Sequence, residues 1–437
     1  MQGESWRGDF LQVNLAYGQR GLNVDLPEGT IIIEPKIQPA LSGQVEAVAR
    51  AIANPVGTEP VGELARGKTV CIVTSDLTRP VPNRPILEAL LPALEEAGAR
   101  RIKILIATGL HRPNTREEFC QMFGEDLASK YEIINHRATS GEELTLVGTL
   151  SDGTPLWVNR HYLEAECKIL TGFIEPHFFA GFSGGRKAIL PGIVGEETIR
   201  RNHSAHHLNN PLATFGQLGG NPIHQQMLEG AQMVGVDFII NVATNRQHQI
   251  TGVFAGELEA AHSQGVDFVR KNAMFPLDAP CDLVVTTNSG YPLDLNLYQA
   301  VKGLSAAAQV TKPGGTIILV AQCREGIGEG AFAELLKGSK SPQEILEQIA
   351  TPGFYRADQW TAQILARILT QMRVYLYSEF IPNHEIAQCH LLPTGDPEAT
   401  VAEIVGDKKM RIAVLPQGPM VIPYLTKERE QNETTGV

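Results

Sequence analysis

The stretch that decides the fold contains three segments, KTVCIVT at 68–74, RPILEALLPALEEA at 84–97 and RIKILIA at 101–107. The first and third are short apolar runs of the kind that form buried strands. The second has apolar residues at spacings of three and four, which indicates an amphipathic helix, and Gly98 is placed to end it. Strand, helix and strand in this order predict a βαβ crossover with two parallel strands.

The same alternation continues along the chain. Further strands are predicted at 132–135, 167–171 and 238–242, with helices at 115–130 and 260–271. A second strand-helix-strand unit opens at Asp282 with DLVVTTNSG, LYQAVKGLSAAAQV and GTIILVA. The pattern predicts an α/β protein with Rossmann-like parallel sheets.

A loop-like stretch, NAMFPLDAP at 272–280, separates these two parts. We therefore predict a first domain over 1–274, with most of the polar motifs, and a second over 275–397. The last predicted strand, MRIAVL at 410–415, lies in a segment, 398–437, that could complete either domain. The sequence leaves these two assignments open.

Composition narrows the class of protein. With 437 residues and 43% hydrophobic residues, the chain can fill two or three cores. The formal net charge of -11 disfavours nucleic acids and anionic membranes as partners. Six scattered cysteines without a C-x-x-C pair indicate reduced thiols, and no apolar run is long enough to span a bilayer. These features predict a cytoplasmic protein with a small-molecule substrate.

Polar motifs directly follow several of the predicted strands, where α/β sheets bind their ligands. SDLTRP at 75–80 follows the first strand, GLHRP at 109–113 the second, and EPHFFAGFSGGRK at 175–187 the strand at 167–171. Asp76 and Thr78 could either cap the next helix or face a ligand. A lone histidine is usually structural, but His111 and His177 follow two different strands and can face one crevice.

The glycine-rich segment GFSGGRK at 181–187 resembles a loop that cradles phosphate with its backbone N–H groups. It is not a P-loop, because Arg186 stands where glycine is needed and Ala188 follows Lys187. Lys187 lies between apolar segments, where a lysine loses its proton more easily and becomes a nucleophile. The alternative is a glycine-rich turn with an exposed lysine.

The segment RNHSAHH at 201–207 contains three histidines. His203 and His207 are four residues apart and would share one face of a helix, yet H-E-x-x-H is absent, so a zinc protease site is unsupported. One imidazole could bind a borderline metal ion as part of an incomplete ligand set. The alternative is a solvated helix end, where histidine cations are favourable.

As a set, the motifs resemble the nickel-pincer lactate racemase family: SDLTRP, GLHRP, GFIEPHFFAGFSGGRKAILPGI at 172–193, RNHS, YPLDLNLYQAVKG at 291–303, and DQW at 358–360. The resemblance implies two α/β domains with the active site in the cleft between them. It also implies a nickel(II) pyridinium-3,5-bisthiocarboxylate mononucleotide, the nickel-pincer nucleotide, attached covalently to Lys187. His203 would bind the nickel, and cofactor-biosynthesis proteins would load the group.

The same resemblance assigns the remaining site residues. His111 and His177 match the two catalytic histidines. The cofactor would also contact a short segment made of Asp76, Leu77, Thr78 and Arg79. Arg79, Gln299 and Lys302 would bind the substrate, with Tyr298 and Trp360 as walls or as plain core residues. Five cations, Arg79, Arg112, Arg186, Lys187 and Lys302, would gather at strand ends and form a pocket for a nucleotide phosphate and one small carboxylate.

The implied activity is a racemase that interconverts the D- and L-forms of a small 2-hydroxy acid, with lactate as the expected substrate. Removing the α-proton of a 2-hydroxy carboxylate would create a second negative charge beside the first. Transient hydride transfer to the pincer ring avoids that dianion, with two histidines as general acid and base. No additional Arg or Lys in the motifs calls for a second carboxylate on the substrate.

Three alternatives stay open at this stage. The first is a racemase or epimerase of another 2-hydroxy acid, namely a longer aliphatic, an aromatic or a sugar acid. The second is an NAD-dependent 2-hydroxy-acid dehydrogenase, but G-x-G-x-x-G is absent after the strands. The third is a non-catalytic binder of a nickel nucleotide, which gives no reason for His111, His177 and Lys302 to occur together.

Overall fold

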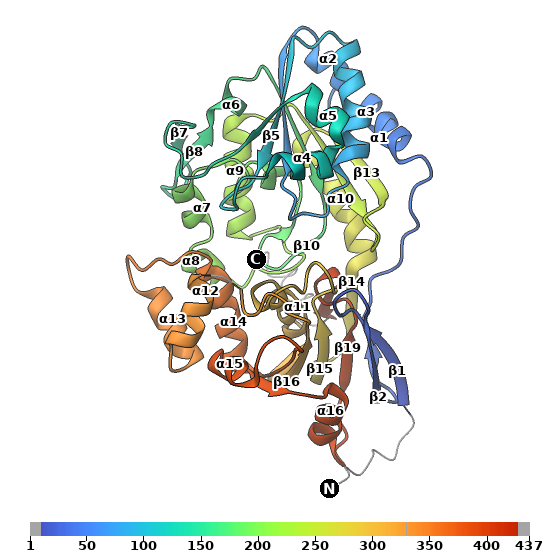
Figure 1. The fold of residues 1–437 in the computed structure, drawn as a ribbon, viewed down its shortest axis with the longest axis vertical. Coiled ribbons are helices and arrows are strands. Elements are labelled where there is room, and N and C mark those ends of the chain that lie inside the picture. The colour runs from blue at the N-terminus through green and yellow to red at the C-terminus, as the bar shows by residue number, and fades with distance from the viewer. Residues whose placement is uncertain (1–9, 329, 427–437) are drawn as a thin grey trace. The chain divides into compact units, whose positions relative to one another are not determined.

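The computed structural model describes residues 10–328 and 330–426 and divides into two compact units. The central unit is Ile37–Asn272, and the split unit combines the residues up to Lys36 with those from Ala273 onward. Each unit contains a six-stranded, mainly parallel sheet, so the predicted two-domain α/β class is confirmed (Figure 1). Among the described helices, none has the length and apolar character needed to cross a membrane.

The sheet of the central unit has the order β13-β12-β9-β4-β5-β6. All neighbouring strands are parallel except β13, which runs antiparallel to β12. The five strands predicted from the sequence are present, each within two residues of its expected ends. The whole sheet consists of β4 (Thr69–Ser75), β5 (Arg101–Ala107), β6 (Glu132–Asn135), β9 (Cys167–Phe173), β12 (Phe238–Thr244) and β13 (Ile250–Gly256), of which β13 was not predicted.

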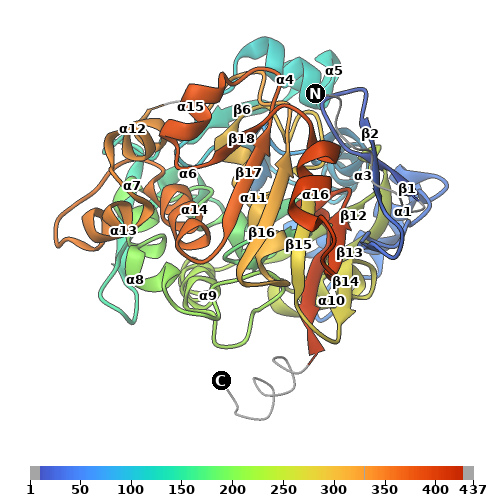
Figure 2. The ribbon, with the colours of Figure 1, turned by 90° about the horizontal axis from the view of Figure 1, so that it is seen from below.

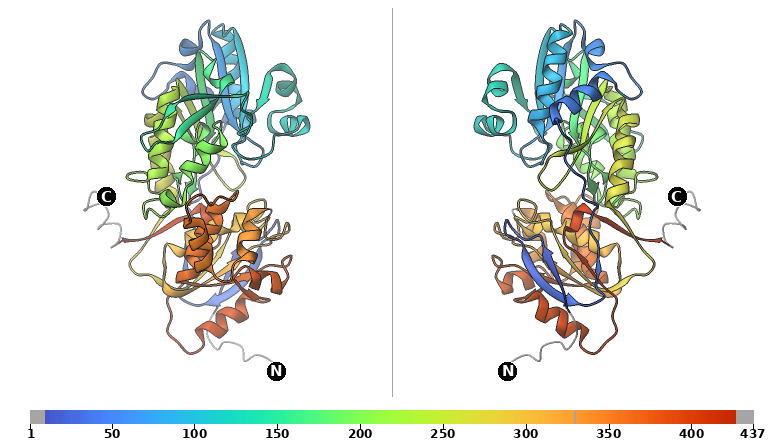
Figure 3. Two further views of the ribbon diagram at one scale, coloured as in Figure 1. Left: turned by 90° about the vertical axis from the view of Figure 1, so that its left-hand side faces the viewer. Right: turned by 90° about the vertical axis from the view of Figure 1, so that its right-hand side faces the viewer.

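Helices cover both faces of this sheet (Figure 3). One buried apolar cluster packs α1 (Gln44–Ala53), α2 (Val61–Ala65) and α3 (Asn83–Glu96) against the strands. The longest helices of the opposite face are α9 (Pro222–Val234) and α10 (Leu258–Ala273). The helix predicted at 115–130 is divided into α4 (Arg116–Phe123) and α5 (Glu125–Lys130), because Gly124 between them has a φ of 86°, outside the helical range.

The remaining elements of the central unit are short. A hairpin of β7 (Leu144–Thr149) and β8 (Pro155–Asn159) precedes α6 (Arg160–Leu163). After β9 come the small pair β10 (Pro176–His177) and β11 (Gly181–Phe182) and a 3-10 turn, η1 (Gly185–Ala188). Two short helices follow, α7 (Glu196–Asn202) and α8 (Ala205–Leu208).

The sheet of the split unit has the order β18-β17-β16-β15-β19-β3, and all of its neighbouring strands are parallel. Its strands are β3 (Ile31–Ile32), β15 (Cys281–Thr287), β16 (Thr311–Val320), β17 (Arg373–Tyr377), β18 (Leu392–Thr394) and β19 (Ile412–Leu415). A separate parallel pair joins β14 (Met274–Leu277) to β20 (Ile422–Leu425), and η2 (Gly418–Met420) follows β19.

Helices and a β-hairpin cover this second sheet. The helices are α11 (Leu297–Ala308), α12 (Ala331–Gly338), α13 (Pro342–Ala350), α14 (Gln359–Gln371), α15 (Asn383–Gln388) and α16 (Pro397–Val405). Helices α11 and α14 pack against each other and against β16. A buried cluster joins the strands to α16 and to the hairpin of β1 (Phe10–Leu15) and β2 (Leu22–Pro27) (Figure 2).

The domain boundaries differ from those expected at the N-terminus. The sequence assigned residues 1–274 to the first domain, but the described residues up to Lys36 belong to the split unit. Val13 and Leu15 of β1, with Val24 and Leu26 of β2, fill an apolar sheet face that would otherwise be exposed. The last predicted strand, β19, pairs with β15 and β3 and so completes the split unit. The expected linker does contain the boundary, at Asn272.

Both sheets reverse their strand order beside one strand. In the central unit, β5 and β6 lie on one side of β4, and β9 and β12 lie on the other. In the split unit, β16 to β18 lie on one side of β15, and β19 and β3 lie on the other. Connections leave such a point in opposite directions, which opens a crevice at the carboxyl ends of the strands. The polar motifs follow β4, β9 and β15, the strands at these points.

Candidate active site

A carboxylate and a histidine meet at the carboxyl ends of β4 and β5. Nδ1 of His111 lies 2.5 Å from Oδ2 of Asp76. The other carboxylate oxygen, Oδ1, accepts hydrogen bonds from the Thr78 hydroxyl at 2.6 Å and the Thr78 N–H at 3.0 Å. The Asp76 side chain is 3% exposed, whereas that of His111 is 43% exposed. The ring of His111 is thus held at one nitrogen and open to solvent elsewhere.

The surroundings of Asp76 keep it charged. Burial alone would raise its pKa, but the hydrogen bond and charge of His111, the charge of Arg79 and the hydroxyl of Thr78 together lower the pKa below its usual value. The alternative of helix capping is wrong, because Pro82 precedes α3 and no side chain caps that helix. Asp76 therefore orients His111 and does not cap the helix.

A second group surrounds the ring of Phe179, in the loop between β10 and β11. His177 and His203 make edge contacts with this ring, at centroid distances of 4.6 and 5.0 Å. Nζ of Lys187, on η1, lies 5.8 Å from the same centroid. The structure thus brings together three predicted site residues from β10, η1 and the end of α7. Nδ1 of His177 accepts the N–H of Ala180 at 3.2 Å, so the neutral ring carries its proton on Nε2.

His203 is buried, with 6% of its surface exposed. Burial, reinforced by the charge of Lys187, lowers its pKa to about 3. The imidazole is therefore neutral at physiological pH, which is the form that binds metals. Among the described residues, no group of three or more His, Cys, Asp or Glu side chains could hold a metal ion. A metal bound by His203 would need ligands from another molecule.

Part of the backbone of the glycine-rich loop is used within the fold. The N–H of Ser183 donates to Glu175 O at 3.0 Å, and that of Gly185 to Asn241 Oδ1 at 2.7 Å, so these two groups are not available to an anion. Gly184 has a φ of 81°, and a Cβ there would lie 2.7 Å from Asn241 Oδ1. Gly184 therefore lets the loop pack closely on β12.

The three histidines of RNHSAHH do not share a helix. His203 ends α7 and Ser204 caps α8, so the predicted common face of His203 and His207 is wrong. The ring of His207 contacts the Asn202 carbonyl at 3.1 Å through Nδ1. Its Nε2 lies 3.7 Å from Asp152. His207 therefore ties the ends of two helices together, and His203 alone faces Phe179.

The predicted site residues of the split unit form a separate group around α11. Lys302 and Gln299 are one turn apart, and Lys302 Nζ donates to Gln299 Oε1 at 2.8 Å. Asn296 caps α11 by accepting the Gln299 N–H. The Tyr298 hydroxyl donates to Asp358 Oδ1 at 3.0 Å, and its pKa is raised by burial and by that carboxylate. Trp360, 8% exposed, lies at the start of α14 beside this pair.

Not every predicted cation belongs to a site. Arg112 is exposed and forms an ion pair with Glu118 at 2.5 Å. Arg186 is 1% exposed, and its guanidinium lies 3.0 Å from Nε2 of His262 and donates to Ala180 O at 2.9 Å. Leu77 packs on the apolar cluster of the unit, and Arg79 is exposed next to Asp76. The exposed ion pair with Glu118 argues against a site role for Arg112, and the expectation that all five cations gather stays a prediction.

Sequence reasoning missed three residues that organise these groups. Phe179 and Asp358 stand inside quoted motifs, but nothing in their type distinguished them from ordinary core or capping residues. Asn241 carried a usable signal, because an amide inside the apolar strand FIINV needs a hydrogen-bond partner once buried. That partner is the N–H of Gly185.

Comparison with known proteins agrees with this arrangement. Two family models match the chain, the lactate racemase N-terminal domain over residues 17–216 and the lactate racemase C-terminal domain over residues 277–423. The lactate racemase of Thermoanaerobacterium thermosaccharolyticum is 40% identical over 94% of this chain and 98% of its own length. That of Lactiplantibacillus plantarum is also 40% identical, over 94% of this chain and 100% of its own.

Solved structures give the same result. The lactate racemase apoprotein from T. thermosaccharolyticum superposes with a TM-score of 0.90 at 40% identity, over 94% of this chain and all of the other. A protein from Thermotoga maritima, 20% identical, shares the fold with a TM-score of 0.67 over 89% of this chain and all of its own.

Fold and site together define a two-domain α/β isomerase with histidines and a lysine at the ends of its strands. The chain belongs to the lactate racemase family.

Proposed function

We propose that this protein interconverts D- and L-lactate with a covalently bound nickel-pincer nucleotide. One observation carries the proposal: the ring of Phe179 brings together Lys187, a neutral His203 and His177 in the central unit. The two relatives at 40% identity, both lactate racemases, support lactate as the substrate.

The residues present fit this cofactor. Lys187 would provide the amine for the covalent bond, and the neutral imidazole of His203 would bind nickel, the remaining ligands coming from the nucleotide itself. A single histidine cannot hold a metal tightly, and the absence of a three-ligand cluster among the described residues agrees with a ligand set shared with the nucleotide. When bound, the group would supply an electron-poor ring that takes and returns the hydride of the substrate α-carbon.

His111 is set up to act as a base. Because Asp76 accepts the proton on Nδ1, the neutral ring of His111 presents a lone pair at Nε2. This nitrogen would accept the proton of the substrate hydroxyl as the α-carbon becomes planar. The buried negative charge of Asp76 then stabilises the imidazolium that forms.

His177 would act on the hydroxyl oxygen of the opposite enantiomer. Its Nδ1 accepts the N–H of Ala180, which fixes the ring with its proton on Nε2, so the ring would act as a base only once this bond is released and the proton is carried on Nδ1. Two histidines are needed because the hydroxyl lies on opposite sides in the two enantiomers, and each direction of reaction uses one as base and the other as acid. The two histidines therefore exchange the roles of base and acid when the reaction runs in reverse.

The substrate carboxylate would be bound by cationic and amide side chains. Arg79 is exposed beside Asp76, and Lys302 with Gln299 presents an ammonium and an amide from α11. Each charge-assisted hydrogen bond is worth about 1.5–3 kcal/mol. Such bonds also retain the planar 2-oxo acid until its hydrogen returns. Tyr298 and Trp360 would limit the size of the substrate side chain.

Chiral chromatography of cofactor-loaded protein tests the function. The panel contains lactate, longer aliphatic 2-hydroxy acids, phenyllactate, malate and sugar acids, each supplied as one enantiomer. We expect lactate to racemise fastest. A faster reaction with another acid would reassign the substrate within the same mechanism. Formation of NADH from lactate and NAD by the purified protein would favour a dehydrogenase and contradict the proposal.

We further propose a cytoplasmic location and dependence on cofactor-biosynthesis proteins. All six cysteines are free thiols, five of them buried, and the cytoplasm would keep them reduced. Protein expressed in a host without the cofactor pathway should be folded but inactive, and it should gain activity when co-expressed with that pathway. Activity without the pathway would refute the cofactor assignment.

A further inference from the structure

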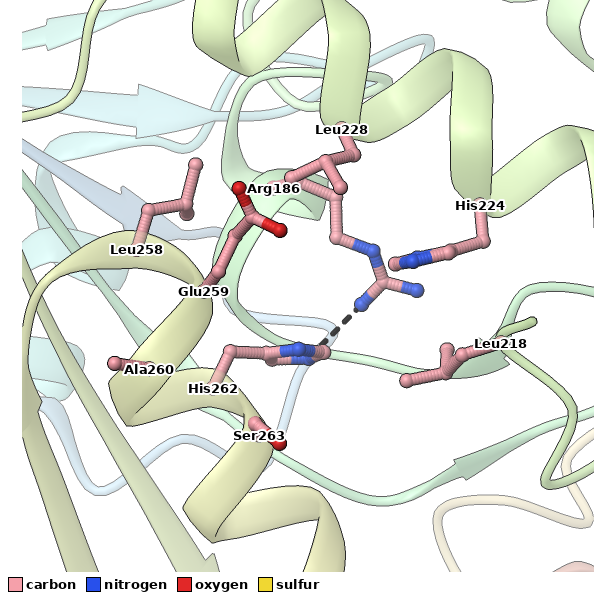
Figure 4. A pocket seen from close by; sticks show the side chains of 9 residues that line it. All are labelled: Arg186, Leu218, His224, Leu228, Leu258, Glu259, Ala260, His262 and Ser263. Atoms are coloured by element: carbon pink, nitrogen blue, oxygen red, sulfur yellow. Dashed lines mark hydrogen bonds between the residues drawn. The ribbon is translucent and has the colours of Figure 1, made fainter.

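A cavity of about 410 Å³ lies in the central unit, on the face of the sheet covered by α9 and α10 (Figure 4). Its size falls within the range of about 300–1,000 Å³ that is usual for small-molecule sites. Side chains from η1, α9 and α10 line it, and they include Arg186, His224 and His262. None of these three has a role in the proposed reaction.

The guanidinium of Arg186 is the central feature of this cavity. In Figure 4 it lies between the imidazole rings of His224 and His262. Nη1 lies 3.0 Å from Nε2 of His262, and Nη2 donates to Ala180 O at 2.9 Å. Backbone carbonyls therefore fix the position of the guanidinium, but they carry no net charge with which to balance it.

The cavity has an uncompensated positive charge. Arg186 is 1% exposed, and no described carboxylate lies within ion-pair distance of it. Burial alone lowers its pKa, to about 9, which leaves it charged at neutral pH. The pKa of His224, lowered by burial and by Arg186, is about 3, and His262 is shifted the same way. A buried charge without a counterion is costly, so an anion bound here would be strongly favoured.

Two nitrogen atoms of the cluster also lack partners. Nε of Arg186 and Nδ1 of His224 are buried and have no hydrogen-bond acceptor or donor among the described residues. Buried polar groups are normally satisfied, and an exception in a cavity wall suggests a missing ligand. Leu218, Leu228 and Leu258 form an apolar part of the remaining wall, which also contains Ser263. Glu259, exposed and bonded to Gln232 at 2.7 Å, is the one carboxylate in the lining.

We propose that this cavity is a binding site for a phosphate group, centred on Arg186 with His224 and His262 beside it. A guanidinium is the side chain best suited to a tetrahedral oxyanion, and the Nε–H of Arg186 has no partner among the described residues. The three leucines leave room for an apolar portion, so a phosphate monoester fits better than the free ion. The 5'-phosphate of the proposed cofactor is a second source of the same chemistry.

Isothermal titration calorimetry of the cofactor-free protein tests the site, with inorganic phosphate and phenyl phosphate as probes and sodium chloride at matched ionic strength as the reference. We expect both probes to bind and phenyl phosphate to bind more tightly. Because this protein carries no cofactor, the result does not depend on the racemase proposal. Absence of binding by both probes would overturn the site.

Variants at the cavity wall make the test specific. His224→Ala should weaken phosphate binding by roughly tenfold, the loss of one hydrogen bond to a charged group. Glu259→Gln removes a repelling charge at the mouth and should tighten binding by roughly two- to fivefold, as expected for a screened surface charge. His206→Ala changes an exposed histidine outside the cavity and should have no effect. Equal affinities in all three variants would refute the assignment.

These variants avoid Arg186, whose loss could prevent folding, and circular dichroism confirms that each one folds.

The cofactor-loaded protein then identifies the source of the ligand. If loaded protein still binds phosphate, the cavity serves a separate phosphate compound. If loading abolishes binding of phosphate, the cofactor's own phosphate occupies the cavity. Both results require binding by the cofactor-free protein, so both support a phosphate site.

Discussion

The two units of the molecule carry different chemistry at equivalent places in their sheets. In the central unit, the residues after β4, β5 and β9 are a carboxylate, two histidines and a lysine, all able to exchange protons or form bonds. In the split unit, the residues after β15 are an amide, a phenol and an ammonium, held by α11 and its cap. The same topology thus supports a reactive group in one unit and a binding group in the other.

The difference also extends to how each group is held. Asp76 and His203 are buried, and each has a pKa lowered by its surroundings. Gln299 and Lys302 are half-buried and contact each other along one turn of helix. Reactive groups need fixed protonation states, whereas groups that bind a carboxylate need only charge and reach. The predictions below test this division of labour.

The largest effect is expected at Lys187. Lys187→Ala removes the amine to which the cofactor is proposed to bind, so covalent attachment and racemisation should both be lost. Intact-mass spectrometry of protein made with the cofactor pathway measures attachment directly. Lys340→Ala, an exposed lysine of the split unit, is the matched control and should keep the full mass shift. A mass shift that survives in Lys187→Ala would contradict the assignment.

His111→Ala and His177→Ala should each reduce kcat by roughly 10²–10⁴-fold, the usual contribution of a general acid or base. Attachment and nickel content should persist, because neither side chain is proposed to hold the cofactor. Chiral analysis gives the rate, and elemental analysis gives the nickel. His384→Ala, an exposed histidine of the split unit, serves as the control. Unchanged activity in one of the two variants would remove that histidine from the mechanism.

Much of this arrangement could be predicted from the sequence, because α/β strands are continuous apolar runs and their carboxyl ends carry the ligands. The strands β4, β5, β6, β9 and β12, and the residues that follow them, were accessible in this way. The hairpin at 10–27 was not, because its alternating pattern shows a half-buried strand but not which sheet it covers. Likewise, the separation of His203 from His207 depends on Ser204, which begins a new helix.

A smaller loss of activity is expected for variants in the split unit. Lys302→Ala should lower kcat/KM by roughly 10- to 100-fold, the equivalent of one charge-assisted hydrogen bond, chiefly through KM. Gln299→Ala removes the neutral member of the pair and should lower kcat/KM by a smaller factor. Cofactor attachment should be normal in both variants when measured by mass spectrometry. Loss of attachment in Lys302→Ala would show that the division between the two units is wrong.

Acid stability should also distinguish the units. In the central unit, the fully buried His136 has a pKa lowered to about 4 by burial. The unfolded chain takes up this proton near pH 6.5, and the folded chain does not until about pH 4. Stability is therefore complete above pH 6.5 and falls with decreasing pH, by about 1.4 kcal/mol per pH unit for each such histidine.

His136→Gln removes this one titration. The difference in the free energy of unfolding between pH 7 and pH 5, measured by urea denaturation, should shrink by roughly 2 kcal/mol relative to the wild type. Hydrogen exchange by mass spectrometry should show the central unit losing protection first as the pH falls. Earlier loss in the split unit would contradict the comparison.

The smallest effect is expected at Thr78, whose hydroxyl donates to the Asp76 carboxylate and positions it. Thr78→Val keeps the shape and removes the hydrogen bond of 2.6 Å to Asp76 Oδ1, while the backbone N–H of residue 78 still reaches that oxygen. We expect kcat to fall by roughly two- to tenfold, less than the full value of a hydrogen bond to a charged group, because the backbone N–H still binds the same oxygen.

A pH profile separates this positioning role from a purely structural one. The hydroxyl of Thr78 helps to lower the pKa of Asp76, so its loss should raise that pKa and move the acid limb of kcat towards higher pH. Thr78→Ser keeps a hydroxyl and should restore the wild-type profile. A uniform loss of activity without movement of the acid limb would mean that Thr78 only packs, and that His111 and the N–H of residue 78 hold Asp76 in place.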